Sequence, residues 1–193
     1  MIIYTDGSCR GNGKTENSGG YGVVILDDDE NLIEVYAHNE ENTTNNRQEL
    51  QAILSAMINY GVKINEDDWN QISIPTVYSD SSYCVQTFNE WMFNWARNGW
   101  IKSDKKVPEN LDLIQLYYQY YQEGYRIDLR KIKGHAGNKW NELADNLATG
   151  KIHPANAMLQ NGVPYEKLPL SYKAYLRLEE IKSNERYFTD INY

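Results

Sequence analysis

The sequence has few cysteines, few basic residues and no long apolar run. Its two cysteines, Cys9 and Cys84, fit a reducing compartment and do not form the Cys/His spacing of a zinc site. No stretch approaches the roughly 20 apolar residues that span a bilayer, and the N-terminus lacks the basic and apolar regions of a signal peptide. These absences argue against a disulfide-stabilised or membrane-spanning protein. We expect a cytoplasmic monomer that does not associate with membranes.

The shortage of positive charge bears on nucleic-acid binding. The chain has 19 Lys and Arg against 27 Asp and Glu, a formal net charge of −8 at pH 7. Affinity for phosphate backbones comes largely from Lys and Arg. Two segments run against the trend: residues 97–106 carry four basic side chains, and residues 126–139 carry six, counting His135. Charge alone favours solvated faces for both, so composition does not decide whether a nucleic acid is the partner.

Apolar periodicity predicts a layered α/β fold. Strands are expected at MIIYTDGS, closing on Asp6, and at residues 19–26, 32–37, 74–78 and 127–132. Helices are expected at residues 45–60, 83–95, 111–121 and 140–149, with Gly61 and Gly150 as stops. Three opening strands followed by alternating helices and strands predict an antiparallel hairpin on an otherwise parallel sheet.

The character of the chain changes after Gly150. Residues 151–193 contain three of the five prolines and a helical pattern near residues 170–183. We expect residues 1–150 to form the catalytic domain and the remainder to be a C-terminal extension. The extension either packs on its own core, which the pattern slightly favours, or contacts an unidentified protein.

Four acids stand in settings unlike the rest of this acidic chain. Asp6 and Asp80 each follow an apolar strand, and Glu49 lies among the apolar positions of its predicted helix. Asp145 follows Asn141 by four residues, which places both on one helix face. A single acid is more often solvated, and the simpler role of Asp80 is to cap the next helix. Because carboxyl ends of neighbouring parallel strands meet at one sheet edge, we nevertheless expect Asp6 and Asp80 to converge.

Converging carboxylates suit phosphodiester hydrolysis. The reaction needs an activated water, neutralised charge on phosphorus and a stabilised leaving oxygen, and two metal ions about 3.5–4 Å apart supply all three. Carboxylates are the hard ligands that Mg²⁺ prefers. Without metal the acids would repel one another and raise their own pKa values, so the ions should partly organise the site.

His135 lies between glycines in Lys-Gly-His-Ala-Gly. Such a setting favours a mobile loop whose imidazole accepts or relays a proton, or assists product departure. A lone histidine is usually structural or simply exposed. The flanking glycines and the downstream Asn-Glu-Leu-Ala-Asp favour a functional role here.

The motifs YTDGS, TTNNRxEL, DSxY, a Trp-rich stretch ending in Gly-Trp with a following DKK, and GHxGxxxNxxAD occur in this order. Over residues 1–150 the chain thereby resembles type 1 ribonuclease H. The resemblance implies a five-stranded mixed sheet flanked by helices, with the first three strands antiparallel and the first, fourth and fifth parallel. It implies cleavage of the RNA strand of an RNA/DNA hybrid, leaving 5′-phosphate and 3′-hydroxyl ends.

The resemblance also implies functional residues. Two Mg²⁺ ions per site, with Mn²⁺ as an alternative ion, would be held by the four acids, and His135 matches the mobile catalytic histidine. Further residues match positions that contact the hybrid. In the minor groove these are Cys9, Asn12, Asn45 and Asn46, and near a DNA-strand phosphate they are Thr44 and Asn110. Ser82 stands where a Gln often contacts the bases. Turn formation and helix capping compete as explanations, above all for Asn45.

Departures from the family pattern concern substrate binding. The loop after Gly-Asn is the longer GKTENS, Ser82 replaces the usual Gln, and the protruding segment near Arg97 carries few basic residues. These changes predict weaker, more salt-sensitive hybrid affinity with the chemistry intact.

Two other functions compete with the ribonuclease interpretation. A DNA-directed nuclease, such as a junction resolvase or integrase core, would share the acidic site but gives no reason for the NNR and GHxG settings. A nucleic-acid binding or scaffold module without catalysis would not need all four acids.

Overall fold

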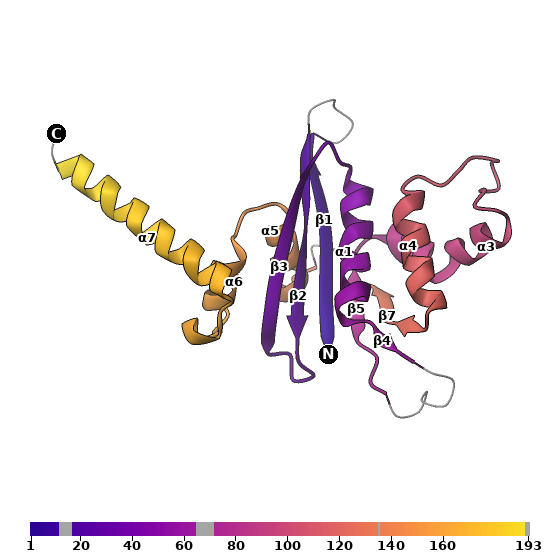
Figure 1. Ribbon diagram of the computed structural model, residues 1–193, viewed down its shortest axis with the longest axis horizontal. Helices are drawn as coiled ribbons and strands as arrows, with labels where there is room; N and C mark the ends of the chain where they lie inside the picture. Colours follow the sequence, from indigo (N-terminus) through magenta and orange to yellow (C-terminus); the bar gives the residue numbers. More distant parts are fainter. Residues whose placement is uncertain (12–16, 65–71, 135, 192–193) are drawn as a thin grey trace.

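A mixed sheet forms the centre of the molecule. The computed structural model describes residues 1–11, 17–64, 72–134 and 136–191, with side chains of the last helix described as far as Ser183. The five strands run in the order β3-β2-β1-β5-β7 (Figure 1). β1 pairs antiparallel with β2 and β2 antiparallel with β3, whereas β5 is parallel to both β1 and β7, which confirms the predicted sheet. The strands are β1 Ile2–Arg10, β2 Ser18–Leu26, β3 Leu32–Glu41, β5 Thr76–Ser79 and β7 Asp128–Lys131.

Helices cover both faces of this sheet and extend beyond it (Figure 1). Those of the first 150 residues are α1 Asn45–Tyr60, α2 Ser82–Gln86, a π-helical turn Thr87–Trp91, α3 Met92–Arg97, α4 Leu111–Gln122 and α5 Lys139–Ala148. The extension adds α6 Pro154–Gln160, a 3₁₀ turn Tyr165–Lys167 and α7 Leu170–Ile191.

Alternation along the central strands creates two separate apolar cores. Ile3 belongs to a core that also contains residues of α1, α2 and α4, whereas its neighbour Tyr4 belongs to a core with residues of α5 and α6. In β2, Val23 lies in the first core and Val24 in the second. Successive side chains of a strand point to opposite faces, so strands that are apolar at every position require a helical layer on each side.

Two glycines let the helices approach the sheet closely. A Cβ at Gly7 of β1 would lie 2.2 Å from the backbone nitrogen of Glu49 in α1. A Cβ at Gly22 of β2 would lie 2.3 Å from the carbonyl oxygen of Ala144 in α5. Gly22 is also the cross-strand partner of Asp6. The missing side chains therefore bring both helices to the part of the sheet that carries Asp6.

The predicted end of the first strand was wrong. β1 continues past Asp6 because β2 pairs with it as far as Arg10. The parallel pairing with β5, however, stops at Thr5 opposite Ser79. Asp6 is therefore the first residue of β1 beyond the parallel ladder, and Asp80 is the first residue beyond β5.

The helix predicted at residues 83–95 is interrupted by the π-helical turn. Cys84, Phe88 and Met92 are all buried, at intervals of four residues. Such spacing drifts around a helix of 3.6 residues per turn, and one wider turn removes the drift. Periodicity also missed the short ladder between β4 Val62–Lys63 and β6 Tyr125–Arg126.

The C-terminal extension packs on the second core. Met158, Val163 and Leu168 are buried there against residues of β2, β3 and α5. The hydroxyl of Tyr172 donates a hydrogen bond of 2.8 Å to the carbonyl oxygen of Val35 in β3. α7 then projects away from the sheet, as Figure 1 shows, and leaves Leu178 exposed. Among the described helices, none has both the length and the apolar character that a membrane crossing requires.

Candidate active site

Three of the four predicted acids converge at the end of the parallel strands. Carboxylate oxygens of Asp6, Glu49 and Asp80 lie within 4.8 Å of one another. Asp6 comes from β1, Asp80 follows β5, and Glu49 reaches the same place from the first half of α1. This spacing allows the three carboxylates to share a divalent cation.

Asp145 lies near this cluster but is not part of it. Its charge acts on Asp6, which places α5 beside the site. Its Oδ2 atom forms an ion pair of 3.2 Å with the amine of Lys151. The three clustered acids are thus Asp6, Glu49 and Asp80, and Asp145 is instead paired with a cation of the chain itself.

Burial and mutual repulsion change the protonation of the cluster. Burial, followed by the charges of the other three acids, raises the pKa of Asp6 to about 8. Burial also raises the pKa of Glu49 to about 7, with hydrogen bonds from Ser81 and Asn45 opposing the charge of Asp80. Carboxylates held together at this cost are typical of functional sites. A divalent cation would stabilise their charged forms and release protons on binding.

Neighbouring groups fix the orientation of the acids. The amide of Asn141 in α5 donates to Asp80 Oδ2 at 3.3 Å, and that of Asn45 donates to Glu49 Oε1 at 2.9 Å. A Cβ at Gly134 would lie 2.4 Å from Asp80 Oδ2, so only glycine lets this loop pass. Asn141 Oδ1 is buried without a hydrogen-bond partner among the described residues, which leaves one oxygen beside Asp80 for a water or an ion.

These pKa shifts predict how the metal-free protein responds to pH. Asp6 and Glu49 have raised pKa values in the folded state, so their contribution to stability is fully present below about pH 4 and is lost as the pH rises through about 7 and 8. Asp6→Asn should therefore exceed the wild type in free energy of unfolding at about pH 9, by on the order of 1–2 kcal/mol, and the difference should shrink toward about pH 5. Urea denaturation of the wild type and Asp6→Asn in EDTA, at each pH, measures this difference in free energy of unfolding. A difference that stays constant across this range would contradict the assignment.

Two of the predicted site residues, the hybrid contact Asn12 and the catalytic histidine His135, fall outside the described residues. Asn46 is exposed at the beginning of α1, and Ser82 is exposed at the beginning of α2. Cys9 is half-buried, with its sulfur 3.4 Å from the carbonyl oxygen of Thr43. Asn45 is tied to Glu49, as described above, so it lies at the edge of the acid cluster itself.

Arg47, which the sequence did not single out, links the beginnings of α1 and α4. Its backbone nitrogen donates to the Thr44 hydroxyl at 3.2 Å, which caps α1. Its guanidinium donates to Asn110 Oδ1 at 3.3 Å and pairs with Asp112 at 2.8 Å. Asn110 has a left-handed backbone with φ of 56°. The arginine in the TTNNRQEL motif, two residues before Glu49, was the available signal.

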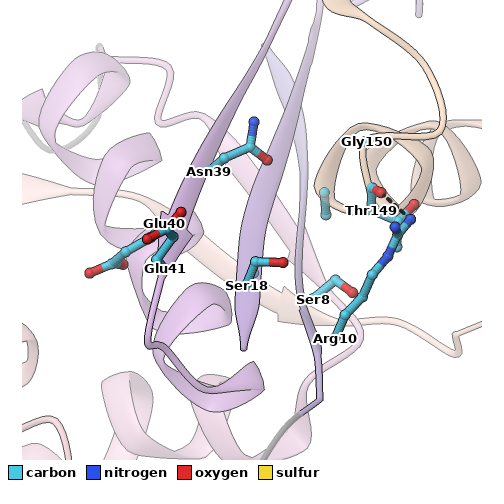
Figure 2. Close-up of a pocket in the computed structure, with 10 residues that line it drawn as sticks. Ser8, Arg10, Ser18, Asn39, Glu40, Glu41, Thr149 and Gly150 are labelled. Atoms are coloured by element: carbon cyan, nitrogen blue, oxygen red, sulfur yellow. Dashed lines mark hydrogen bonds between the residues drawn. The ribbon is translucent and has the colours of Figure 1, made fainter. Parts of the chain in front are cut away.

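A polar cavity of about 470 Å³ lies farther along β1. Asp6, Ser8 and Arg10 alternate along the strand and so share one face. Figure 2 shows Ser8, Ser18 and Arg10 around this cavity, with Arg10 reaching to the end of α5, where it donates to the Thr149 carbonyl oxygen at 2.7 Å. Sequence reasoning did not identify Arg10 because its position on the strand is its only signal.

The basic segment near Arg97 is sparsely charged in space as well. Arg97 ends α3, and its guanidinium donates to Phe93 O and Asn94 Oδ1. Lys102 lies 3.6 Å from the carboxylate of Asp104. Part of the positive charge in this segment is thus already matched by acceptors of the chain.

Comparison with known proteins gives a consistent result. The family model for RNase H matches residues 1–153. A ribonuclease H of Thermoanaerobacter sp. (strain X514) is 38% identical over 153 residues, which covers 78% of this chain and 88% of the relative.

Solved structures agree on the fold. LC9-RNase H1, a type 1 RNase H with the type 2 active-site motif, is 27% identical with a TM-score of 0.59, covering 90% of this chain and 82% of that one. LC11-RNase H1, solved in complex with an RNA/DNA hybrid, is 23% identical with a TM-score of 0.53, covering 81% and 98%.

Proposed function

The chain belongs to the ribonuclease H family of hydrolytic endonucleases, and from that premise we propose that it cleaves the RNA strand of RNA/DNA hybrids with two divalent ions held by its four acids. The observation that carries the proposal is the convergence of Asp6, Glu49 and Asp80 within 4.8 Å. Asp145, from α5, is the fourth proposed ligand. Mg²⁺ is the proposed ion because the donors are all carboxylates, and Mn²⁺ suits the same oxygen ligands.

The chain supplies positioning for this reaction. When bound, the ions would activate water and stabilise charge on the phosphorus and on the leaving oxygen. Asn141 and Asn45 hold the carboxylates of Asp80 and Glu49 in place, so little reorganisation is needed when a cation binds. Raised pKa values in the cluster make the acids ready to exchange protons for metal near neutral pH.

We assign the surrounding residues to hybrid binding. Cys9, Asn12, Asn45 and Asn46 are proposed to contact the minor groove, and Ser82 is proposed to face the bases. Short polar side chains suit this task, because discrimination depends on sensing the 2′-hydroxyl of one strand. His135 is proposed as the proton-relaying or product-releasing residue of its glycine loop.

Thr44 and Asn110 are proposed to flank a DNA-strand phosphate. The support is the bridge by Arg47, which brings the first turn of α1 to the first turn of α4. Hydroxyl and amide groups near a guanidinium suit phosphate recognition.

A substrate panel tests the function. Labelled RNA/DNA hybrid, RNA duplex, single-stranded RNA and DNA duplex are incubated with the protein in Mg²⁺ or EDTA. We expect cleavage of the hybrid alone, in Mg²⁺ alone, with 5′-phosphate and 3′-hydroxyl ends. Preferential cleavage of DNA would favour a DNA-directed nuclease, and tight binding without cleavage would favour a scaffold module.

The thin basic segment predicts modest hybrid affinity. Adding lysines at Ala96 and Asn98, beside Arg97, should tighten hybrid binding and steepen its dependence on salt, by about 0.9 in the log–log slope for each new phosphate contact. Fluorescence anisotropy in Ca²⁺ at several salt concentrations measures this. Equal affinity and slope in Ala96→Lys/Asn98→Lys and wild type would show that this segment does not approach the hybrid.

A further inference from the structure

The ion pair between Lys151 and Asp145 introduces a cation beside a site built for cations. The amine of Lys151 lies 3.2 Å from Asp145 Oδ2. The Asp145 side chain is 25% exposed, and that of Lys151 is 57% exposed. The amine can therefore leave for solvent without breaking any buried contact.

The backbone after α5 directs Lys151 back along that helix. Gly150 adopts φ of 67°, and the nitrogens of Lys151 and Ile152 then both donate to the carbonyl oxygen of Asn146, at 2.9 and 3.3 Å. Ile152 packs against the second core, and His153 caps α6 through its Nδ1 atom. The backbone of Lys151 is thus held between the C-terminal turn of α5 and the N-terminus of α6, which fixes the position of its Cα atom beside α5.

Two other cations make different contacts. Arg10 donates to the Thr149 carbonyl oxygen at the end of α5, as Figure 2 shows. Lys131, at the end of β7, donates to the carbonyl oxygen of Ile132, and its charge acts on Glu49. Lys151 is the amine that the fold places on the fourth acid.

We propose that Lys151 is a resident counter-ion of Asp145 that a divalent cation must displace, so that this residue sets the metal affinity of the site. The proposal deepens the proposed function, on which it rests in taking Asp145 as a metal ligand. An ammonium on Oδ2 neutralises the fourth acid while the site is metal-free. It also competes for the carboxylate and repels an approaching Mg²⁺. Lys151 is a positioning residue in this scheme and takes no part in bond cleavage.

Direct metal titration tests the proposal without substrate. Lys151→Gln retains length and polarity but removes the charge, and should bind Mg²⁺ or Mn²⁺ about three- to tenfold more tightly than wild type by calorimetry, the range expected for one partly screened charge. Lys151→Arg should remain near wild type. Lys173→Gln is the matched control, because its amine bonds to Glu166 O in the extension, and it should not change the affinity.

Thermal melting gives a second measurement. Removal of the counter-ion should lower the midpoint in EDTA and enlarge the increase on adding Mg²⁺, because tighter metal binding stabilises the folded state more. A Lys151→Gln variant that binds metal no more tightly than wild type would overturn the proposal. If the wild type binds metal but does not cleave the hybrid, the proposed function is contradicted instead. The two failures are therefore distinguishable.

Discussion

Asp80→Asn should reduce hybrid cleavage by at least about 10³-fold in kcat at saturating Mg²⁺, the order of loss expected when a charged group that stabilises the transition state is removed. The reason is geometric and electrostatic together. Asp80 is the carboxylate that β5 delivers to Asp6, and it is held by Asn141 at 3.3 Å. A neutral amide keeps the size of the side chain but is a poor ligand for a hard cation.

The matched control is Asp29→Asn, which removes the same charge from an exposed turn between β2 and β3. Its activity should equal that of the wild type. Urea denaturation of both variants in EDTA separates loss of function from loss of fold, and Asp80→Asn should be no less stable than wild type, because it relieves repulsion within the cluster. Cleavage by Asp80→Asn within tenfold of the wild-type rate, or wild-type activity that survives EDTA, would contradict the two-metal mechanism.

The meeting of Asp6 and Asp80 could be predicted because it depends on local patterns and one rule of sheet topology. Apolar runs identified both strands, and parallel neighbours bring their carboxyl ends together. The length of β1 could not be predicted in the same way, because its last residues are held by pairing with Ser18, Gly19 and Gly20 of β2. Hairpin pairing of polar residues leaves no apolar signal in the strand itself.

The positions of Glu49 and Asp145 relative to Asp6 depend on features that a single sequence indicates only indirectly. Helical periodicity placed each on a helix, but their distance from Asp6 is set by Gly7 and Gly22, where the helix backbones take the space of a side chain. The Lys151 contact depends on the turn at Gly150 and on the packing of α6, which short periodicity did not reveal. Close backbone approach and the docking of an extension are tertiary properties, and residue patterns predict them poorly.

Truncation after Gly150 should destabilise the protein by more than about 5 kcal/mol, since removing one buried Leu or Met side chain alone costs about 2–5 kcal/mol. The extension buries Met158, Val163 and Leu168 on the second core. Its removal would expose Val35 and Leu147 to water. A loss of this size approaches the total stability of a typical domain, about 5–15 kcal/mol. The truncated chain should therefore be largely unfolded near 37 °C, as circular dichroism melting would show.

Two milder variants keep this prediction testable if the truncated chain does not fold. Truncation after Ser183 keeps Tyr172 and Leu176, which pack on the second core, and should leave the melting midpoint nearly unchanged. Leu168→Ala in the full chain should cost about 2–5 kcal/mol in urea denaturation. A 150-residue chain that melts like the full protein would instead make the extension an independent tail. The chain ending at Gly150 would lose activity by unfolding, so it cannot report on a partner of α7. A search for such a partner therefore requires the chain ending at Ser183 as its control.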